Sequence, residues 1–261
     1  MQKWYAAGLP ENQFKLTEVS AAECKDNRAE VLLITYNDEG RLSCTPGLPP
    51  LDDNDPDFKG PTMTLSDKEN VGMLNKISNF AHELGHAWGL LHEHQNPAFW
   101  EYPYSTSGIQ NKWQFNCQNL KDYAQKATEL TPEELQRACT ERNYAAEKKF
   151  SASEYLPQLG GGRGEGGGFG SDPDYQSIML YPSGAGATGP ASPGNDGRTA
   201  ILLNLDGSRV PINLDPSRRD VDGILKLYNT DWPTTNPTLI SEPSNPKSNK
   251  FKSFFKRKKC L

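Results

Sequence analysis

The sequence predicts an α+β domain, and three observations support this fold class. Residues 1–9 form a short amphipathic segment and residues 30–36 are rich in leucine and β-branched side chains, which is typical of a helix followed by a buried strand. Apolar residues then recur at helical intervals over residues 67–88. The 261-residue chain also contains 23 glycines and 20 prolines, which favours a loop-rich globular protein over a helical bundle or a repeat array.

A loop and a short strand are expected between the first strand and the long helix. Residues 44–60 are rich in Pro, Asp and Gly, a composition typical of loops. The extended run at residues 62–65 follows and is a candidate edge strand. Aspartates alternate within the loop as calcium ligands do, but the glycine and the final glutamate of a calcium-binding loop are missing. We therefore interpret these aspartates as part of a solvated acidic loop.

The helix predicted over residues 67–88 has signals at both ends. Ser66 stands three residues before Glu69, which is the spacing of a capping box. Gly89 follows the helix, and glycine commonly ends helices because it adopts left-handed backbone angles without a Cβ clash. One uninterrupted helix is expected between these signals.

The second half of the chain predicts a helical hairpin, a spacer and a final helix. Thr131, Pro132 and Glu134 form a second capping box within the hairpin. Residues 160–170 are glycine-rich but lack the Lys-Ser/Thr ending of a phosphate-binding loop, so we interpret them as a flexible linker. Residues 215–228 begin with Asp-Pro and repeat apolar side chains at helical spacing, which predicts a packed helix.

The tail, residues 231–261, is rich in Pro, Ser and Asn and then becomes basic, a composition typical of disorder. Residues 247–261 carry seven basic side chains and no acidic one, so the rest of the chain is more acidic than the net charge of −5 indicates. An acidic body argues against nucleic acid as a partner, because binding of phosphate backbones needs a basic face. Phenylalanines lie between the lysines of the tail, as in segments that bind anionic membranes, which is the alternative to a disordered basic tail.

Five cysteines allow two disulfides and one remaining thiol. Proximity in the sequence favours Cys24 with Cys44 and Cys117 with Cys139, and it leaves Cys260 in the tail. Reduced, buried thiols are the alternative. No apolar run approaches the roughly 20 residues needed to cross a bilayer, and residues 1–10 lack the charged start and apolar core of a signal peptide.

All four histidines of the chain lie within thirteen residues, and three of them follow the pattern His-Glu-x-x-His-x-x-Gly-x-x-His. On a helix, His82 and His86 share one face and can present two ring nitrogens to one metal ion. A turn at Gly89 lets His92 approach the same ion and leaves an open position, as in catalytic zinc sites. Glu83 is then the candidate general base. Histidines merely packed on an amphipathic helix are the weaker alternative.

The segment 82–92 resembles the zinc signature of the metzincin peptidases, most closely the astacin family. Residues 175–181 are similar to the methionine turn of these enzymes. The resemblance implies that Met179 is the apolar floor below the metal and that Tyr181 is a fifth zinc ligand, able to donate a hydrogen bond to the oxyanion. Glu93 matches the astacin residue that pairs with the matured N-terminus.

The resemblance also implies a fold and an activity. The fold is a two-lobed catalytic domain over residues 1–230, with a twisted sheet and two helices in the upper lobe, a mostly helical and irregular lower lobe, and an insertion at residues 105–170. The activity is that of a secreted, extracellular zinc metalloendopeptidase. One Zn²⁺ per chain, a monomer, and protein or peptide substrates bound by strand addition to residues 62–65 are expected.

Two departures from the astacin pattern put substrate preference in doubt. Leu180 stands where astacins usually carry histidine, and residues 95–97 replace a run of charged residues. His94 is interpreted as a neighbour of the metal site or a surface group. Two other functions are kept as alternatives, a non-catalytic zinc-binding interaction module and a membrane-surface effector using the tail. The presence of Glu83 argues against the first, because metal binding does not require a general base.

Overall fold

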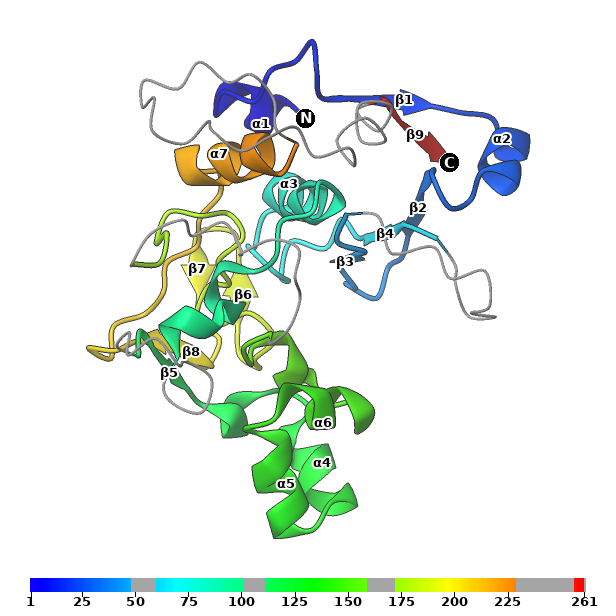
Figure 1. The fold of residues 1–261 in the computed structure, drawn as a ribbon. Coiled ribbons are helices and arrows are strands. Elements are labelled where there is room, and N and C mark those ends of the chain that lie inside the picture. Colours follow the sequence, from blue (N-terminus) through cyan, green and yellow to red (C-terminus); the bar gives the residue numbers. More distant parts are fainter. Residues whose placement is uncertain (48–59, 101–110, 159–171, 229–255, 261) are drawn as a thin grey trace.

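The computed structural model describes residues 1–47, 60–100, 111–158 and 172–228, together with the backbone of residues 256–260. The described residues form an α+β fold with one five-stranded sheet and two small two-stranded sheets. Figure 1 shows the large sheet and helices α1, α3 and α7 toward one end of the molecule, with helices α4, α5 and α6 at the other. None of the helices in these segments is long and apolar enough to span a membrane.

The large sheet has the strand order β1-β9-β2-β4-β3. The pairs along it are parallel except for β3, which runs antiparallel to β4. Its strands are β1 (Lys15–Glu18), β2 (Leu32–Tyr36), β3 (Ser43–Cys44), β4 (Thr62–Leu65) and β9 (Lys256–Cys260).

The sheet corrects two expectations. Strand β4 is not an edge, because β2 pairs with one side and β3 with the other, so it cannot receive a substrate strand as predicted. The prediction that the whole tail is disordered is wrong for β9, which lies between β1 and β2 in the sheet. The rest of the tail, the glycine-rich spacer and most of the acidic loop lie outside the described residues.

The helices follow the local signals with one exception. The predicted first helix is α1 (Gln2–Ala6), and the predicted hairpin contains α4 (Tyr123–Glu129), α5 (Pro132–Ala138) and α6 (Arg142–Glu147). The capping box at Thr131 is confirmed. Short helix α2 (Ala21–Asp26) was not predicted, and the last helix is α7 (Arg218–Leu227), capped by Ser217.

The exception is the long helix, because α3 covers only Lys76–Ala87. The predicted capping box at Ser66 is wrong. The true cap is Asn75, whose side chain accepts a hydrogen bond from the backbone N–H of Ser78. Helical angles are interrupted before it, since Gly72 has φ 55° and Leu74 has φ 53°.

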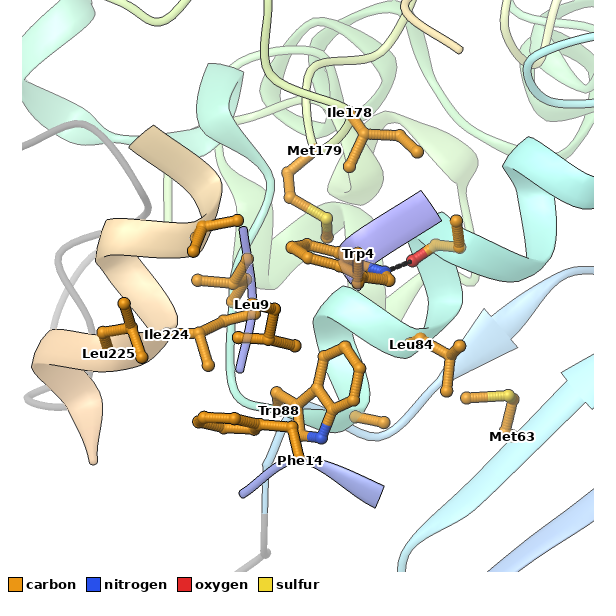
Figure 2. Packing of buried hydrophobic residues seen from close by; sticks show 14 of the residues in the cluster. Trp4, Leu9, Phe14, Met63, Leu84, Trp88, Ile178, Met179, Ile224 and Leu225 are labelled. Carbon is orange, nitrogen blue, oxygen red and sulfur yellow. Dashed lines mark hydrogen bonds between the residues drawn. The ribbon is translucent and has the colours of Figure 1, made fainter. Parts of the chain in front are cut away.

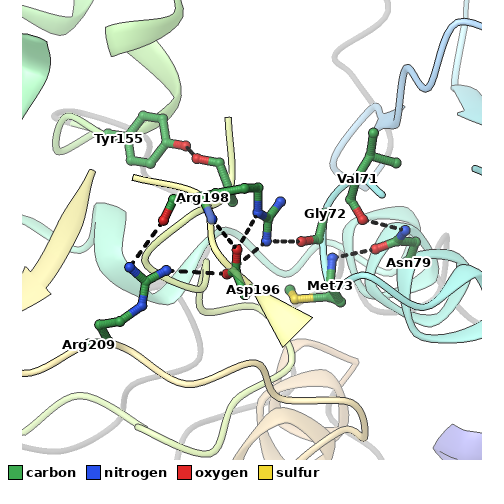
Figure 3. A network of polar contacts seen from close by, with 9 residues as sticks. Val71, Gly72, Met73, Asn79, Tyr155, Asp196, Arg198 and Arg209 are labelled. Carbon is green, nitrogen blue, oxygen red and sulfur yellow. Dashed lines mark hydrogen bonds and ion pairs between the residues drawn. The ribbon is translucent and has the colours of Figure 1, made fainter. Parts of the chain in front are cut away.

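Side-chain hydrogen bonds from Asn79 of α3 and from the distant Arg198 hold this non-helical segment in place (Figure 3). The Asn79 side chain accepts from the backbone N–H of Met73 at 2.7 Å and donates to the carbonyl of Val71 at 3.1 Å. Arg198, only 4% exposed, donates to the Gly72 carbonyl at 3.0 Å and pairs with Asp196. These tertiary bonds replace the helical ones that the local pattern favours.

The disulfide between Cys117 and Cys139 is confirmed. The second predicted pair is wrong, because Cys24 is disulfide-bonded whereas the Cys44 side chain is a thiol that donates to the Thr45 carbonyl. Proximity in sequence misled here, because Cys24 lies on α2 and Cys44 on β3, at the far edge of the sheet.

Two apolar cores meet at the segment that follows residue 177. The first core packs α1, α3 and α7 together, and Figure 2 shows Trp4 at its centre, donating from its indole N–H to the Ala81 carbonyl at 2.9 Å. The second core surrounds Trp113 of β5 (Trp113–Phe115), which pairs with β8 (Leu202–Asn204). Met179 belongs to the first core and Leu180 to the second. The third sheet is the hairpin of β6 (Ala191–Ser192) and β7 (Asn195–Asp196).

Candidate metal centre

Helix α3 presents His82 and His86 on one face, and both rings are held by hydrogen bonds at Nδ1. His82 Nδ1 lies 2.7 Å from the Ile178 carbonyl oxygen, and His86 Nδ1 lies 2.7 Å from the Leu90 carbonyl oxygen. A carbonyl oxygen can only accept, so each Nδ1 carries the proton and each Nε2 has a free lone pair. The predicted helix end at Gly89 is confirmed, with φ 99°. It places the Leu90 carbonyl beside His86 by turning the chain back over the last helical turn.

His92 reaches the same point from outside the helix. Its backbone is extended, and its Nδ1 lies 2.8 Å from Oε1 of Gln95. The Gln95 amide nitrogen faces the carbonyls of Ser153 and Leu156, at 3.2 Å each, which identifies Oε1 as the acceptor of the His92 proton. The Nε2 lone pair of His92 is therefore also free.

The three Nε2 atoms converge. His86 and His92 approach to 2.9 Å, His82 and His92 to 3.3 Å, and ligand atoms from all three residues lie within 4.8 Å of one another. Three lone pairs cannot hydrogen-bond to one another when every proton is on Nδ1, so this arrangement repels itself unless a cation is shared. The donor set, three neutral imidazoles, fits zinc. The residues present therefore fit the metal that the sequence predicts.

Burial keeps these rings neutral. It lowers the pKa of His82 to about 4. Burial first, and the neighbouring His82 next, lower the pKa of His86 to about 3. Burial also lowers the pKa of His92 well below its usual value, with His86 adding to the effect. Metal ligation needs the unprotonated ring, so burial prepares all three side chains for a cation.

Glu83 lies between the two helical histidines in sequence and is 4% exposed. Burial, and then the charge of Glu154, raise its pKa to about 8. Its Oε2 atom has no hydrogen-bond partner among the described residues. A buried carboxyl group with one open oxygen and a raised pKa beside a metal-binding cluster is suited to accept and return a proton.

Met179 packs against Gly85 of α3, the helix that carries His82 and His86. It is fully buried, and a Cβ placed on Gly85 would lie 2.5 Å from its sulfur. A side chain at position 85 would therefore require Met179 to move from this place. The sequence pattern alone gave no reason for a glycine here, because position 85 is variable in the zinc motif.

Tyr181 packs against the histidine cluster. Its ring centroid lies 4.2 Å from that of His92 and 5.8 Å from that of His82. Burial, and then the charge of Glu154, raise the pKa of its hydroxyl well above the usual value, so the group stays protonated and able to donate. His94 is fully buried and stacks on His92 at 5.2 Å, so it is a neighbour of the site and not a surface group.

Residues from distant segments hold the turn that carries Met179. Asp220 of α7 accepts hydrogen bonds from the Ser177 hydroxyl at 2.6 Å and the Ile178 amide at 2.9 Å. Glu93 is fully buried, and its carboxylate accepts from the Asp174 amide at 2.7 Å. Sequence reasoning missed the roles of Asp220 and Gln95. The spacing of Ser217 and Asp220 marks the capping box of α7, but no local pattern indicates the contact of Asp220 with residues 177 and 178 or the role of Gln95.

A family model described as Peptidase M66 matches residues 69–168, a segment that includes all four histidines but ends before Met179 and Tyr181. A solved structure of myroilysin matches with 19% sequence identity over 76% of this chain and 73% of that chain, with a TM-score of 0.36. No curated protein matches. The peptidase family match and the three-histidine cluster together support a metallopeptidase.

Proposed function

We propose that the chain is a zinc-dependent metalloendopeptidase of metzincin type that hydrolyses peptide bonds of proteins. The convergence of three Nε2 lone pairs from His82, His86 and His92 carries this proposal. These three residues would hold one Zn²⁺ per chain. The chemistry that zinc supplies when bound is polarisation of the peptide carbonyl and acidification of the attacking water.

The protein's own groups then move the protons. Glu83 takes the proton from the attacking water and later delivers it to the leaving amine. Its burial supports this exchange, because a group whose pKa lies well above the usual carboxyl value holds a transferred proton more firmly than an exposed carboxylate does. Tyr181 keeps its hydroxyl proton and donates a hydrogen bond to the oxyanion of the tetrahedral state. Met179 supports the helix from below without touching the reacting atoms.

The proposal includes a compartment and a family. Secretion fits the Cys117–Cys139 disulfide, since such bonds persist in oxidising environments. The astacin family is proposed because Tyr181 follows Met179 by two residues and Glu93 follows the third histidine. A monomer that acts on peptides or unfolded proteins is the simplest form of the enzyme.

The test is cleavage of a denatured protein substrate with and without a chelator, and again after zinc is returned. Cleavage that stops with the chelator and resumes with zinc is expected. Glu83→Ala should retain about one zinc per chain and lose nearly all activity, because the ligands survive while the proton acceptor does not. Cleavage that survives chelation would rule out the proposed mechanism, and loss of zinc together with activity would count against the role of Glu83.

A further inference from the structure

The third histidine differs from the other two in how it is positioned. His82 and His86 are fixed by α3, but His92 lies on extended backbone with φ −66° and ψ 134°. Its ring orientation therefore depends on side-chain contacts. Its Nδ1 donates a hydrogen bond to the side-chain oxygen of Gln95, three residues later, which is 5% exposed.

Gln95 uses both ends of its amide. The oxygen accepts from His92 at 2.8 Å, and the nitrogen donates to the carbonyls of Ser153 and Leu156 at 3.2 Å each. These carbonyls belong to the turn that includes the 3-10 helix η4 (Ser151–Glu154), which follows α6. The backbone N–H of Gln158 also donates to the backbone carbonyl of Gln95 at 3.0 Å. Gln95 thus joins the metal-binding cluster to residues 151–158.

The chemistry of glutamine explains why this residue type is present. Glutamate would accept from His92 equally well, but its second oxygen would face two carbonyl oxygens with no proton between them. Leucine has a similar size but neither accepts nor donates. Among side chains of this length, glutamine alone satisfies both His92 and the carbonyls of 151–158.

We propose that Gln95 is a positioning residue that couples metal binding at His92 to the docking of residues 151–158. This inference rests on the proposed zinc site. Zn²⁺ bound to His92 fixes the orientation of the imidazole ring. The ring then fixes the Gln95 side chain, and Gln95 holds residues 151–158 in place. By linkage, the docked turn raises the affinity for zinc by the same factor.

Residues 151–158 have other anchors, which limits the size of the expected effect. The Ser151 hydroxyl and backbone N–H both donate to Asp122, and the Tyr155 hydroxyl donates to the Ala185 carbonyl. Loss of Gln95 should therefore loosen this turn without unfolding the helical region.

The experiment measures Zn²⁺ affinity by competition with a chromophoric chelator, and hydrogen exchange of residues 150–158 with and without Zn²⁺. Gln95→Leu should weaken zinc binding by about 10- to 100-fold, the range for lost partners of metal ligands. In the wild-type chain, zinc should slow exchange over 150–158, and in Gln95→Leu it should not. Gln114→Leu is the matched control, because the exposed Gln114 side chain donates to the Leu205 carbonyl, away from His92 and from residues 151–158.

Gln95→Glu separates the two bonds. It keeps an acceptor for His92 but loses the donors to residues 151–158, so it should recover only part of the zinc affinity that Gln95→Leu loses, while exchange over 150–158 stays fast with and without Zn²⁺. The exchange of residues 150–158 in the wild-type chain, measured with and without Zn²⁺, keeps the test decisive if either variant fails to fold.

Three results would overturn the inference. The first is a zinc affinity of Gln95→Leu equal to that of the wild type. The second is hydrogen exchange over 150–158 in the wild type that does not change when zinc binds, and the third is an equal loss of zinc affinity in Gln95→Leu and Gln95→Glu. None of these readouts uses peptide cleavage. A wild-type chain that binds zinc but cleaves nothing would contradict the proposed function and leave this coupling standing.

Discussion

The carboxylate of Asp220 accepts a hydrogen bond from the backbone N–H of Ile178 at 2.9 Å, and the carbonyl of Ile178 accepts one from His82 at 2.7 Å. Helix α7 is thereby connected to a candidate metal ligand through a single peptide segment. The same carboxylate accepts from the Ser177 hydroxyl and from the Ser217 N–H, so three donors depend on it. The residue is 1% exposed.

Asp220→Ala should lower the free energy of unfolding by about 3 kcal/mol or more, because buried donors left without an acceptor each cost about 1–3 kcal/mol. Zinc affinity should fall as well, since the Ile178 carbonyl no longer holds His82 in place. Urea denaturation and metal competition measure the two effects. Asp215→Ala is the control, because Asp215 is exposed and its ion pair with Lys3 is worth less than about 1 kcal/mol. Equal losses in the two variants would remove the special role of Asp220.

Gly85→Ala tests the contact between the helix and Met179. The new Cβ would lie 2.5 Å from the Met179 sulfur and 3.1 Å from the Trp4 ring. Overpacking of this kind costs about 1–3 kcal/mol, whereas alanine gains about 1 kcal/mol over glycine in a helix. The substitution should therefore destabilise the wild type and become neutral or stabilising when Met179 is also Ala. If Gly85→Ala lowers the free energy of unfolding by the same amount in the wild type and in Met179→Ala, measured by denaturation, the contact with Met179 is not the cause of the destabilisation.

The buried histidines should contribute less to the stability of the metal-free chain as the pH falls below 6.5, while the buried carboxyl groups of Glu83, Glu93 and Asp220, whose pKa values are raised, act in the opposite direction. Burial lowers the pKa of His82 and His94 to about 4 and of His86 to about 3, from a usual value of 6.5. The unfolded chain binds more protons at these groups between pH 6.5 and 4, so they stabilise the fold above pH 6.5 and lose that contribution as the pH falls. Urea denaturation in the presence of a chelator, at several pH values across this window, measures the slope. Stability from these groups that rises on acidification would contradict the burial of neutral rings.

Glu83 should act in the opposite direction. Burial, with Glu154, raises its pKa from 4.5 to about 8, so the folded chain binds the extra proton between these values. Its contribution is present below pH 4.5 and is lost as the pH rises through about 8. The chelated wild type should therefore lose stability between pH 7 and 9, and Glu83→Gln, which stays neutral, should show a flatter profile. Parallel profiles for the two chains would mean that Glu83 is ionised at neutral pH without zinc.

Tyr181→Phe removes the hydroxyl and keeps the ring that packs on His92. If the hydroxyl stabilises the oxyanion, kcat should fall by about 10²- to 10³-fold with KM little changed. Zinc content should stay near that of the wild type. Steady-state kinetics on a peptide substrate and metal analysis provide both values. A kcat within a few-fold of wild type would make Tyr181 only a packing residue, and a rise in KM alone would indicate uniform substrate binding.

The sequence by itself determined the features that depend on near neighbours along the chain. The four-residue spacing brings His82 and His86 to one helix face, and Gly89 ends that helix where predicted. The capping box at Thr131 and the Cys117–Cys139 disulfide also link residues close in sequence. These interactions are local, so a pattern of residue types is enough to predict them.

Only the tertiary structure decided the rest, because the deciding contacts join residues far apart in sequence. Helix α3 begins only at Lys76, and Arg198, from a distant loop, holds the carbonyl of Gly72 in the non-helical segment before it. Strand β4 is not the edge strand that the sequence predicted, because the two residues of β3 pair with it. Gln95 is fixed by carbonyls about sixty positions away, and Asp220 by a turn about forty away. These hydrogen bonds depend on the three-dimensional arrangement of distant segments, which the spacing of residue types along the chain does not predict. The same bonds hold the candidate ligands in place.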